Sequence, residues 1–437
     1  MQSPRLSGKA DPGTRRAHRE SRGPMSGHCV IIGAGHGAAQ LCASLRQERW
    51  EGPVTLIGSE PFLPYHRPPL SKTQLDPDSD TTLQLIRPEE FYARHQIETK
   101  LGVRVTAIDR ERKRVETGTR EIAYDKLVLC LGSLHRRPPI DGIGHEKVFV
   151  LQTATDAEGL RHAAKAGARA VIIGGGFIGL EVAASLRKRG LDVTVLELAP
   201  RVLSRVTSPE VSGYFENLHR SQGVSLNIGV SVTGIEDCGS GLKVHAAEGQ
   251  EYAADFVVLG AGAAANTALA ETAGLETANG ILVDEFNRTS APDIYALGDC
   301  CNQFRPRYQQ RMRLESVQNA VDQAKTVAAS LAGNASPHDA LPWFWSDQYE
   351  SKLQIVGVST GYDRVIVRGT TGPGGAFSAW YYHGEKLLAV DAVNDSLAYA
   401  VGTKLLKAGL HPAPEDVANQ NLETKRLQTK AKEQTNA

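Results

Sequence analysis

The sequence of 437 residues has few cysteines, no long apolar run and no excess of either charge. Its six cysteines have neither the density of a disulfide scaffold nor the spacing of metal ligands, so we expect no metal site and a reducing, cytoplasmic compartment. No uninterrupted apolar stretch reaches the roughly 18 residues of a membrane-spanning helix, and glycines interrupt the stretch that begins at Cys29. Basic and acidic residues balance at 49 each, which indicates neither nucleic acid nor a membrane as the partner.

The first 24 residues are basic, rich in Arg, Ser, Gly and Pro, and lack the apolar core of a secretory signal. We expect residues 1–26 to form a disordered basic extension. A transit peptide would account for this composition, and a natural start at Met25 is the simpler account.

Two segments of the chain repeat the order strand, glycine turn, helix, strand. The first runs from a strand at 30–32 to a strand at 54–57, and the second spans 170–196. Both turns fit G-x-G-x-x-G/A, in which one glycine turns tightly, the next lets a pyrophosphate approach, and the last residue allows close helix packing. A lone match would be weak, because many glycine turns bind nothing, but two in this context predict two dinucleotide sites. The residues that form the motifs are Gly33, Gly35, Gly37 and Ala38 in the first turn, and Gly174, Gly176 and Gly179 in the second.

The residue that follows the second strand of each repeat predicts how the ribose is held. Glu197 follows the strand at 193–196, where a carboxylate bonds the ribose hydroxyls of NAD and repels the extra phosphate of NADP. We therefore expect NADH at the second site, a preference that Arg201 and Arg205 would soften. A solvated glutamate at a strand end is the competing interpretation. In the first repeat Ser59 and Glu60 follow the strand, which is a less usual arrangement.

The remaining pattern divides the chain into domains of an α/β protein. A strand at 126–131 and a proline-rich run at 136–142 place a boundary near residue 140, and later strands at 256–260 and 293–297 indicate a return to the first domain. Aromatic and alternating residues after Pro342 predict a small sheet. The predicted division is a first dinucleotide-binding domain at 27–140 and 264–342, a second at 141–263, a C-terminal α+β domain at 343–425, and a solvated polar tail at 426–437.

The chain resembles the putidaredoxin, rubredoxin and Rieske-dioxygenase ferredoxin reductases, which are glutathione-reductase-like flavoproteins. The resemblance runs from about residue 28 to about residue 395 and rests on both glycine turns, PYHRPPLSK, Gly298-Asp299, LESVQN at 314–319 and PWFWSDQY at 342–349. It implies two Rossmann-like domains that bind FAD and NAD, followed by a C-terminal domain. It also implies that hydride passes from NADH to FAD and that single electrons then pass to a [2Fe-2S] ferredoxin of a multicomponent oxygenase, either a Rieske oxygenase or a cytochrome P450 system.

The resemblance assigns roles to individual positions. It makes Lys72 and Glu181 a candidate catalytic ion pair at the place where nicotinamide meets flavin, although Lys72 alone would suit a solvated surface. Phe177 corresponds to an aromatic flap over the nicotinamide pocket, with core packing equally open. Asp299 corresponds to the aspartate that bonds the ribityl chain of FAD. It would also suit an N-cap of the next helix, and the two roles are compatible. The implied FAD contacts are Gly37, Arg67, Lys72, Val105, Arg136, Asp299, Val317 and Trp345, and Gly262 joins the NAD site.

Two positions depart from the family pattern. Ser59 stands where an acidic residue is usual, and neighbouring Glu60 is placed to compensate. Gln152 stands where an arginine is usual, which leaves that FAD contact open.

The sequence also lacks the Cys-x4-Cys pair with which disulfide reductases of this superfamily relay electrons. Cys42 is alone on its predicted helix, and Cys300 and Cys301 are expected to be two separate thiols. Without a thiol relay, reduced flavin has to deliver its electrons to an external acceptor. Rubredoxin reductase is the nearest alternative function, a thiol-dependent NADH oxidase or CoA-disulfide reductase is more distant, and an NADH-sensing flavoprotein like apoptosis-inducing factor is a non-enzyme alternative.

A cluster of arginines predicts where an acidic ferredoxin would dock. Arg305, Arg307, Arg311 and Arg313 lie in one short loop of a chain without net charge, and such a patch would steer an acidic partner. A solvated loop is an equally good interpretation, and Arg313 could instead brace the LESVQN segment.

Overall fold

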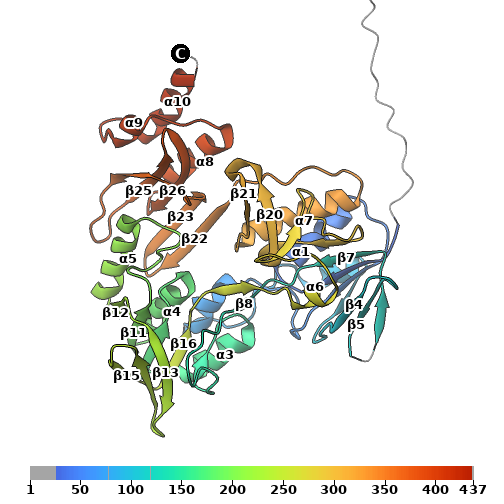
Figure 1. The fold of residues 1–437 in the computed structure, drawn as a ribbon, viewed down its shortest axis with the longest axis horizontal. Helices are drawn as coiled ribbons and strands as arrows, with labels where there is room; N and C mark the ends of the chain where they lie inside the picture. Colours follow the sequence, from blue (N-terminus) through green and yellow to red (C-terminus); the bar gives the residue numbers. More distant parts are fainter. Residues whose placement is uncertain (1–25, 77, 119, 436–437) are drawn as a thin grey trace, which may run out of the picture.

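The protein is described by a computed structural model that covers residues 26–76, 78–118 and 120–435. The predicted N-terminal extension lies outside the described residues, apart from Ser26. None of the helices in these ranges is both long enough and apolar enough to cross a membrane. Figure 1 shows two sheet-and-helix units side by side, with a third unit above one of them.

The first unit is built on a parallel five-stranded sheet with the strand order β19-β7-β1-β2-β3. The central strand is CVII, and all four side chains are buried, as expected of a parallel strand with both faces covered. The strands are β1 (Cys29–Ile32), β2 (Val54–Ile57), β3 (Ile97–Lys100), β7 (Lys126–Leu129) and β19 (Ile294–Ala296).

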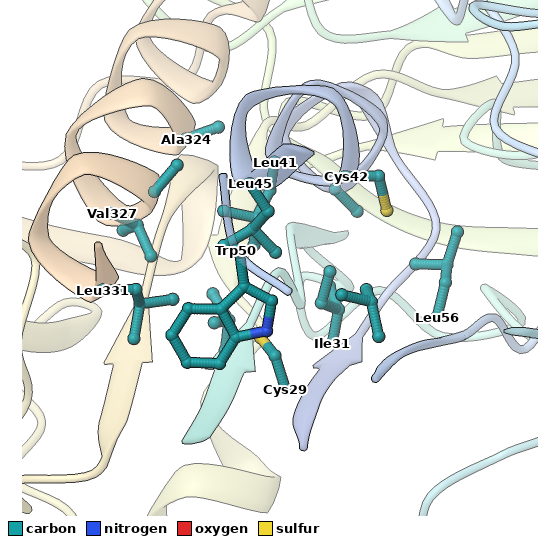
Figure 2. Packing of buried hydrophobic residues seen from close by; sticks show 14 of the residues in the cluster. Cys29, Ile31, Leu41, Cys42, Leu45, Trp50, Leu56, Ala324, Val327 and Leu331 are labelled. Carbon is teal, nitrogen blue, oxygen red and sulfur yellow. The ribbon is translucent and has the colours of Figure 1, made fainter. Parts of the chain in front are cut away.

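Helices α1 (His36–Gln47) and α7 (Val317–Leu331) pack together although they are far apart in the sequence (Figure 1). Figure 2 shows Leu41 and Leu45 of α1 and Val327 and Leu331 of α7 gathered around Trp50. Each fully buried leucine contributes about 1.5–3 kcal/mol to folding. This shared core explains why the chain returns to its first domain.

Smaller elements surround the first sheet. They are α2 (Glu89–Arg94), α6 (Ala268–Thr272), a sheet of β4 (Ala107–Asp109), β5 (Arg114–Glu116) and β6 (Glu121–Ala123), and a sheet of β18 (Ile281–Val283), β20 (Cys301–Arg305) and β21 (Gln310–Met312). An antiparallel ribbon of β8 (Ser133–His135) and β17 (Ala263–Ala265) carries the chain out of the first unit and back.

The second unit repeats the design with the strand order β12-β11-β10-β16-β9. Its strands are β9 (Val148–Phe149), β10 (Arg169–Ile173), β11 (Asp192–Glu197), β12 (Ser225–Ile228) and β16 (Phe256–Leu259). Its helices are α3 (Ala154–Ala163), α4 (Phe177–Lys188) and α5 (Pro209–Ser221), and a meander of β13 (Val232–Asp237), β14 (Leu242–Ala246) and β15 (Glu251–Ala254) completes it. The predicted α/β fold with two Rossmann-like domains is confirmed.

The third unit is an antiparallel five-stranded sheet covered by helices. The strands are β22 (Trp343–Gln348), β23 (Ser351–Gly357), β24 (Arg364–Gly369), β25 (Phe377–His383) and β26 (Lys386–Val393), and the helices are α8 (Ser396–Ala408), α9 (Pro414–Ala418) and α10 (Leu427–Thr435).

The segment predicted as a solvated tail forms the helix α10 in its described part, and most of its side chains are exposed, but two of them are buried. Leu427 and Ala431 lie four apart on one face of α10, and both are buried against the C-terminal core. Arg368 of β24 holds the preceding segment, because its guanidinium donates to the carbonyls of Val417 and Asn419 at 2.8 and 2.7 Å. The prediction followed the mostly polar composition of this segment and overlooked two apolar side chains, which lie on one face of the helix.

Candidate functional site

A cavity of about 320 Å³ lies where the three domains meet, within the usual range of ligand pockets. The first domain lines it with the first glycine turn and with η1 (Pro68–Ser71). The second domain lines it with the start of α4, and the third with β22. The candidate residues that the fold brings to this cavity are Gly35, Gly37, Ala38, Arg67, Lys72, Gln152, Phe177, Glu181, Asp299, Val317 and Trp345.

The three glycines of the first turn have different tasks. Gly33 has φ +103°, and a Cβ there would lie 2.1 Å from the carbonyl oxygen of Cys130. A Cβ on Gly37 would lie 2.3 Å from the Leu297 side chain, whereas one on Gly35 would meet no atom within 4 Å. Gly33 and Gly37 are therefore required for the packing of the fold. Gly35 is not, and it leaves open space at the start of the helix.

The second turn repeats this division. A Cβ on Gly174, which has φ +110°, would lie 2.4 Å from the Gly260 carbonyl oxygen, and one on Gly179 would lie 2.1 Å from that of Gly174. A Cβ on Gly176 would meet nothing within 4 Å. Both α1 and α4 start without a side-chain cap and without an acidic residue in the first turn, so their N–H groups are available to an anion. Both turns fit the pyrophosphate of a dinucleotide.

Glu197 lies beside the second turn at the end of β11. Its carboxylate accepts hydrogen bonds from the backbone N–H of Gly175 and, at 2.7 Å, of Ala199. Nearby Arg201 donates to Ser212 Oγ at 2.6 Å and so braces its own loop. Gly262 faces the same loop, because a Cβ there would lie 3.1 Å from the Arg205 guanidinium.

The loop after the first turn is held by polar contacts of its own. Glu60 pairs with Arg67 at 2.7 Å and accepts a hydrogen bond from Tyr65 at 2.6 Å, while Ser59 is exposed. Arg67 also donates to the Gln152 carbonyl at 2.6 Å. The Gln152 side chain donates to the carbonyl of Ser133 and thereby ties the interdomain ribbon to the cavity wall.

Val105 and Arg136, which the resemblance implies as FAD contacts, are among the candidate residues that do not line the cavity. Val105 packs against the core under the first sheet. Arg136 is exposed and donates to the Ala263 carbonyl at 3.0 Å across the ribbon.

The predicted ion pair is present in the structure. Lys72 Nζ lies 2.6 Å from Glu181 Oε2, and the Glu181 side chain is only 5% exposed. Ser71 Oγ donates to the same oxygen at 2.5 Å, and Ser346 Oγ donates to Oε1 at 2.7 Å. Neither serine was predicted from the sequence. Ser71 adjoins Lys72 in PYHRPPLSK and Ser346 lies within PWFWSDQY, so their place in the two motifs was the available signal.

Asp299 lines the cavity, in the segment after β19, and is partly buried. This burial, with neighbouring Glu315, raises the pKa of its carboxyl to about 7, although Arg313 and Arg67 oppose the shift. In the same cavity burial lowers the pKa of His36 to about 4, and its Nε2 has no protein partner. A polar ligand chain would give both side chains hydrogen-bonding partners.

Aromatic side chains form the wall from β22. The rings of Phe177 and Phe344 are 4.5 Å apart at their centroids, and those of Trp343 and Trp345 are 5.5 Å apart. Phe177 therefore both lines the cavity and packs against the third domain, so the two interpretations of this residue are compatible.

The cysteines in the described ranges are free thiols. Cys42 is fully buried, and the sulfurs of Cys300 and Cys301 are 3.9 Å apart. The expectation that none of them forms a disulfide beside the cavity agrees with this arrangement.

The predicted docking patch requires a correction. Arg305 is only 3% exposed and donates to Asn319 at 2.6 Å, so it is unavailable to a partner. Arg307 donates to the Leu406 carbonyl at 2.8 Å, and Arg313 contacts Glu315 within the LESVQN segment. Because side chains alternate along β20, Arg305 points inward. The prediction had considered only the charge of the four arginines and not the direction of each side chain. Arg311 is exposed.

Comparisons with known proteins agree with this geometry. Residues 27–324 match the pyridine nucleotide-disulphide oxidoreductase family, and residues 343–428 match the reductase C-terminal family. The chain is 41% identical to rhodocoxin reductase of Rhodococcus erythropolis over 398 residues, which are 91% of this chain and 93% of that protein. It is 40% identical to putidaredoxin reductase of Pseudomonas putida over 410 residues, 92% and 97% of the two chains. The structure of the covalent complex of putidaredoxin reductase with putidaredoxin aligns with a TM-score of 0.89 and 38% identity, covering 93% of this chain and 99% of that chain.

Proposed function

Because this chain belongs to the pyridine nucleotide-disulphide oxidoreductase family, we propose that it is an FAD-dependent, NADH-oxidising ferredoxin reductase that serves a multicomponent oxygenase. The observation that carries the proposal is the shared cavity, into which the first glycine turn, the start of α4 and the Lys72–Glu181 pair all open. The likeness to reductases of redoxins extends over almost the whole chain and so includes the third domain.

When bound, FAD takes up a hydride from NADH and gives up its electrons singly. The residues of the chain bind and orient the two dinucleotides. We propose that Gly35 and the start of α1 hold the pyrophosphate of FAD, with Arg67, Gln152, Asp299 and Val317 along its length. Gly176 and the start of α4 hold that of NADH, and Glu197 accepts from its ribose once it exchanges its present backbone bonds.

At the junction of the two ligands the protein supplies charge and excludes water. Lys72 presents its ammonium to the cavity, and Glu181 neutralises it from behind. Phe177, Phe344 and Trp345 add apolar surface to the wall of the same cavity. Because no cysteine pair opens on this cavity in the described ranges, we propose that electrons leave through its mouth to a separate protein. The free thiols suit a cytoplasmic location.

The test is steady-state turnover of the FAD-loaded protein with NADH or NADPH. The acceptors are plant-type, vertebrate-type and Rieske-type ferredoxins, a rubredoxin, and oxygen alone. We expect NADH and one class of [2Fe-2S] ferredoxin to give the highest kcat/KM. Preferred reduction of the rubredoxin would make the protein a rubredoxin reductase. Rapid oxygen consumption without a carrier would refute the proposal. So would a protein that reduces none of these carriers.

For the docking surface we propose Arg311, the exposed member of the arginine loop. Arg311→Gln should raise the KM for the ferredoxin and flatten its salt dependence, because exposed charges act mainly on encounter. Arg120→Gln is the matched control, since Arg120 is also exposed but directly precedes β6, which belongs to a different sheet from β21. Equal effects of the two substitutions would place docking elsewhere.

A further inference from the structure

A continuous set of buried polar side chains runs from the cavity into the interface between the second and third domains. Glu181 Oε1 accepts from Ser346 Oγ at 2.7 Å, and Ser346 Oγ accepts from Gln348 Nε2 at 3.2 Å. Gln348 Oε1 in turn lies 2.9 Å from His219 Nε2. Ser346, Gln348 and His219 are each 0% exposed.

The strand β22 contributes side chains both to the cavity wall and to this set of buried polar residues. Side chains alternate along a strand, so Phe344, Ser346 and Gln348 share one face and Trp345 lies on the other. The first face packs on α4, where Phe344 meets Phe177 and Ser346 meets Glu181. The strand therefore fixes the position of Glu181 relative to the aromatic wall.

The donors and acceptors can be arranged in only one direction. Ser346 donates its single hydroxyl hydrogen to the carboxylate, so it has to accept from the Gln348 amide. The Gln348 oxygen is then the acceptor for Nε2–H of a neutral His219, whose pKa burial lowers to about 4. Every hydrogen in the set points toward Glu181, and hydrogen bonds aligned in this way strengthen one another.

These hydrogen bonds also fix the orientation of the Glu181 carboxylate. A buried carboxylate with one cation can rotate, but Glu181 is held at Oε1 by Ser346 and at Oε2 by Ser71 and Lys72. Its two oxygens are thereby assigned to different partners. Lys72 is 23% exposed and would otherwise have several rotamers available toward the cavity.

We propose that Ser346, supported by Gln348 and His219, is a positioning residue for hydride transfer: it fixes the Glu181 carboxylate and, through it, the Lys72 ammonium at the junction of the two dinucleotides. The proposal deepens the proposed function and rests on it for the identity of the hydride donor. Neither Gln348 nor His219 lines the cavity, so their effect passes through Ser346.

The main experiment compares anaerobic flavin reduction by NADH in the FAD-loaded wild-type protein and in Ser346→Ala. At saturating NADH we expect Ser346→Ala to be slower by about tenfold, which corresponds to about 1.4 kcal/mol in the activation barrier. Its FAD content and the NADH dissociation constant should be unchanged, and the long-wavelength absorbance of the nicotinamide–flavin complex should weaken. Ser346→Thr, which keeps the hydroxyl in a strand, should recover the rate to within about threefold.

A second measurement does not depend on the donor. The reduction potential of the bound flavin, measured against a reference dye with dithionite, should fall in Ser346→Ala, because a displaced Lys72 stabilises reduced flavin less. This fall would support the positioning role even if NADPH rather than NADH proved to be the donor. Gln348→Met, which is close in volume and remote from the cavity, should give a smaller fall in rate and potential.

Two controls separate positioning from loss of stability. Ser378→Ala removes another fully buried hydroxyl of the third domain, which accepts from Trp380 at 3.0 Å. It should lower the melting temperature without changing flavin reduction. In a Lys72→Met background, Ser346→Ala should change the rate by less than about twofold, since the residue acts through that pair. An unchanged rate and potential in Ser346→Ala, a loss as large in Ser378→Ala, or an undiminished loss without Lys72 would each overturn the proposal.

Discussion

Among single residues, Lys72 is the clearest test of the site. Lys72→Met removes the cation beside Glu181, so flavin reduction by NADH should slow while FAD content stays normal. The free energy of unfolding should fall by at most about 3 kcal/mol, because Ser71 and Ser346 still donate to the buried carboxylate. Stopped-flow absorbance and denaturant titration measure the two effects. The double variant Lys72→Met/Glu181→Gln should regain stability but not rate, and unchanged reduction kinetics in Lys72→Met would remove this residue from the mechanism.

Asp299 predicts a pH dependence of stability. Burial raises the pKa of its carboxyl to about 7, far above the ordinary value of 3.8. Between these values the folded protein retains a proton that the unfolded chain releases, so the free energy of unfolding falls as pH rises from about 4 to about 7. In protein stripped of FAD, the melting temperature of the wild type should therefore fall relative to that of Asp299→Asn between about pH 4 and pH 7. Parallel melting profiles would show that this carboxyl titrates normally.

At the scale of an element, the glycines of the turn before α4 have different roles, some in folding and one in binding. Gly179→Ala places a Cβ 2.1 Å from the Gly174 carbonyl oxygen, so it should destabilise the protein by about 1–3 kcal/mol. Gly176→Ala meets no atom within 4 Å and keeps an ordinary φ of −80°, so it should leave stability unchanged but raise the NADH dissociation constant. Chemical denaturation and NADH titration distinguish the two. If Gly176→Ala bound NADH normally, the turn would be structural only.

At the scale of the whole molecule, the second and third domains share one core. Leu180 and Phe215 of the second pack with Leu353, Phe377 and Tyr381 of the third. The fragment 1–342 would expose this apolar surface, so it should aggregate or bind a hydrophobic dye strongly, unlike the full chain. Size-exclusion chromatography and dye fluorescence test this prediction. A monodisperse fragment that binds no dye would show that the two domains are independent.

Local pattern was sufficient for much of the fold. Strand β2 was predicted to the residue at 54–57, and the strands predicted at 30–32, 126–131, 193–196, 256–260 and 293–297 lie within one or two residues of those observed. These elements follow from buried apolar runs and obligatory glycines, which depend on near neighbours. The outer strands β3, β9 and β12 were not predicted. The helix α10 was not predicted, because the docking of Leu427 and Ala431 depends on a core formed by distant strands.

The sequence alone determined the fold class and the paired dinucleotide turns, since motifs at fixed spacing carry this information, whereas the pairing of Lys72 with Glu181 was implied by the family resemblance. The tertiary structure decided which polar groups those motifs meet. It turned Arg305 inward against Asn319, and it brought Ser346, Gln348 and His219 from two domains to one buried carboxylate. The contacts of Ser346 with Glu181 and of Gln348 with His219 join residues more than a hundred positions apart, and burial and direction, rather than spacing along the chain, establish them.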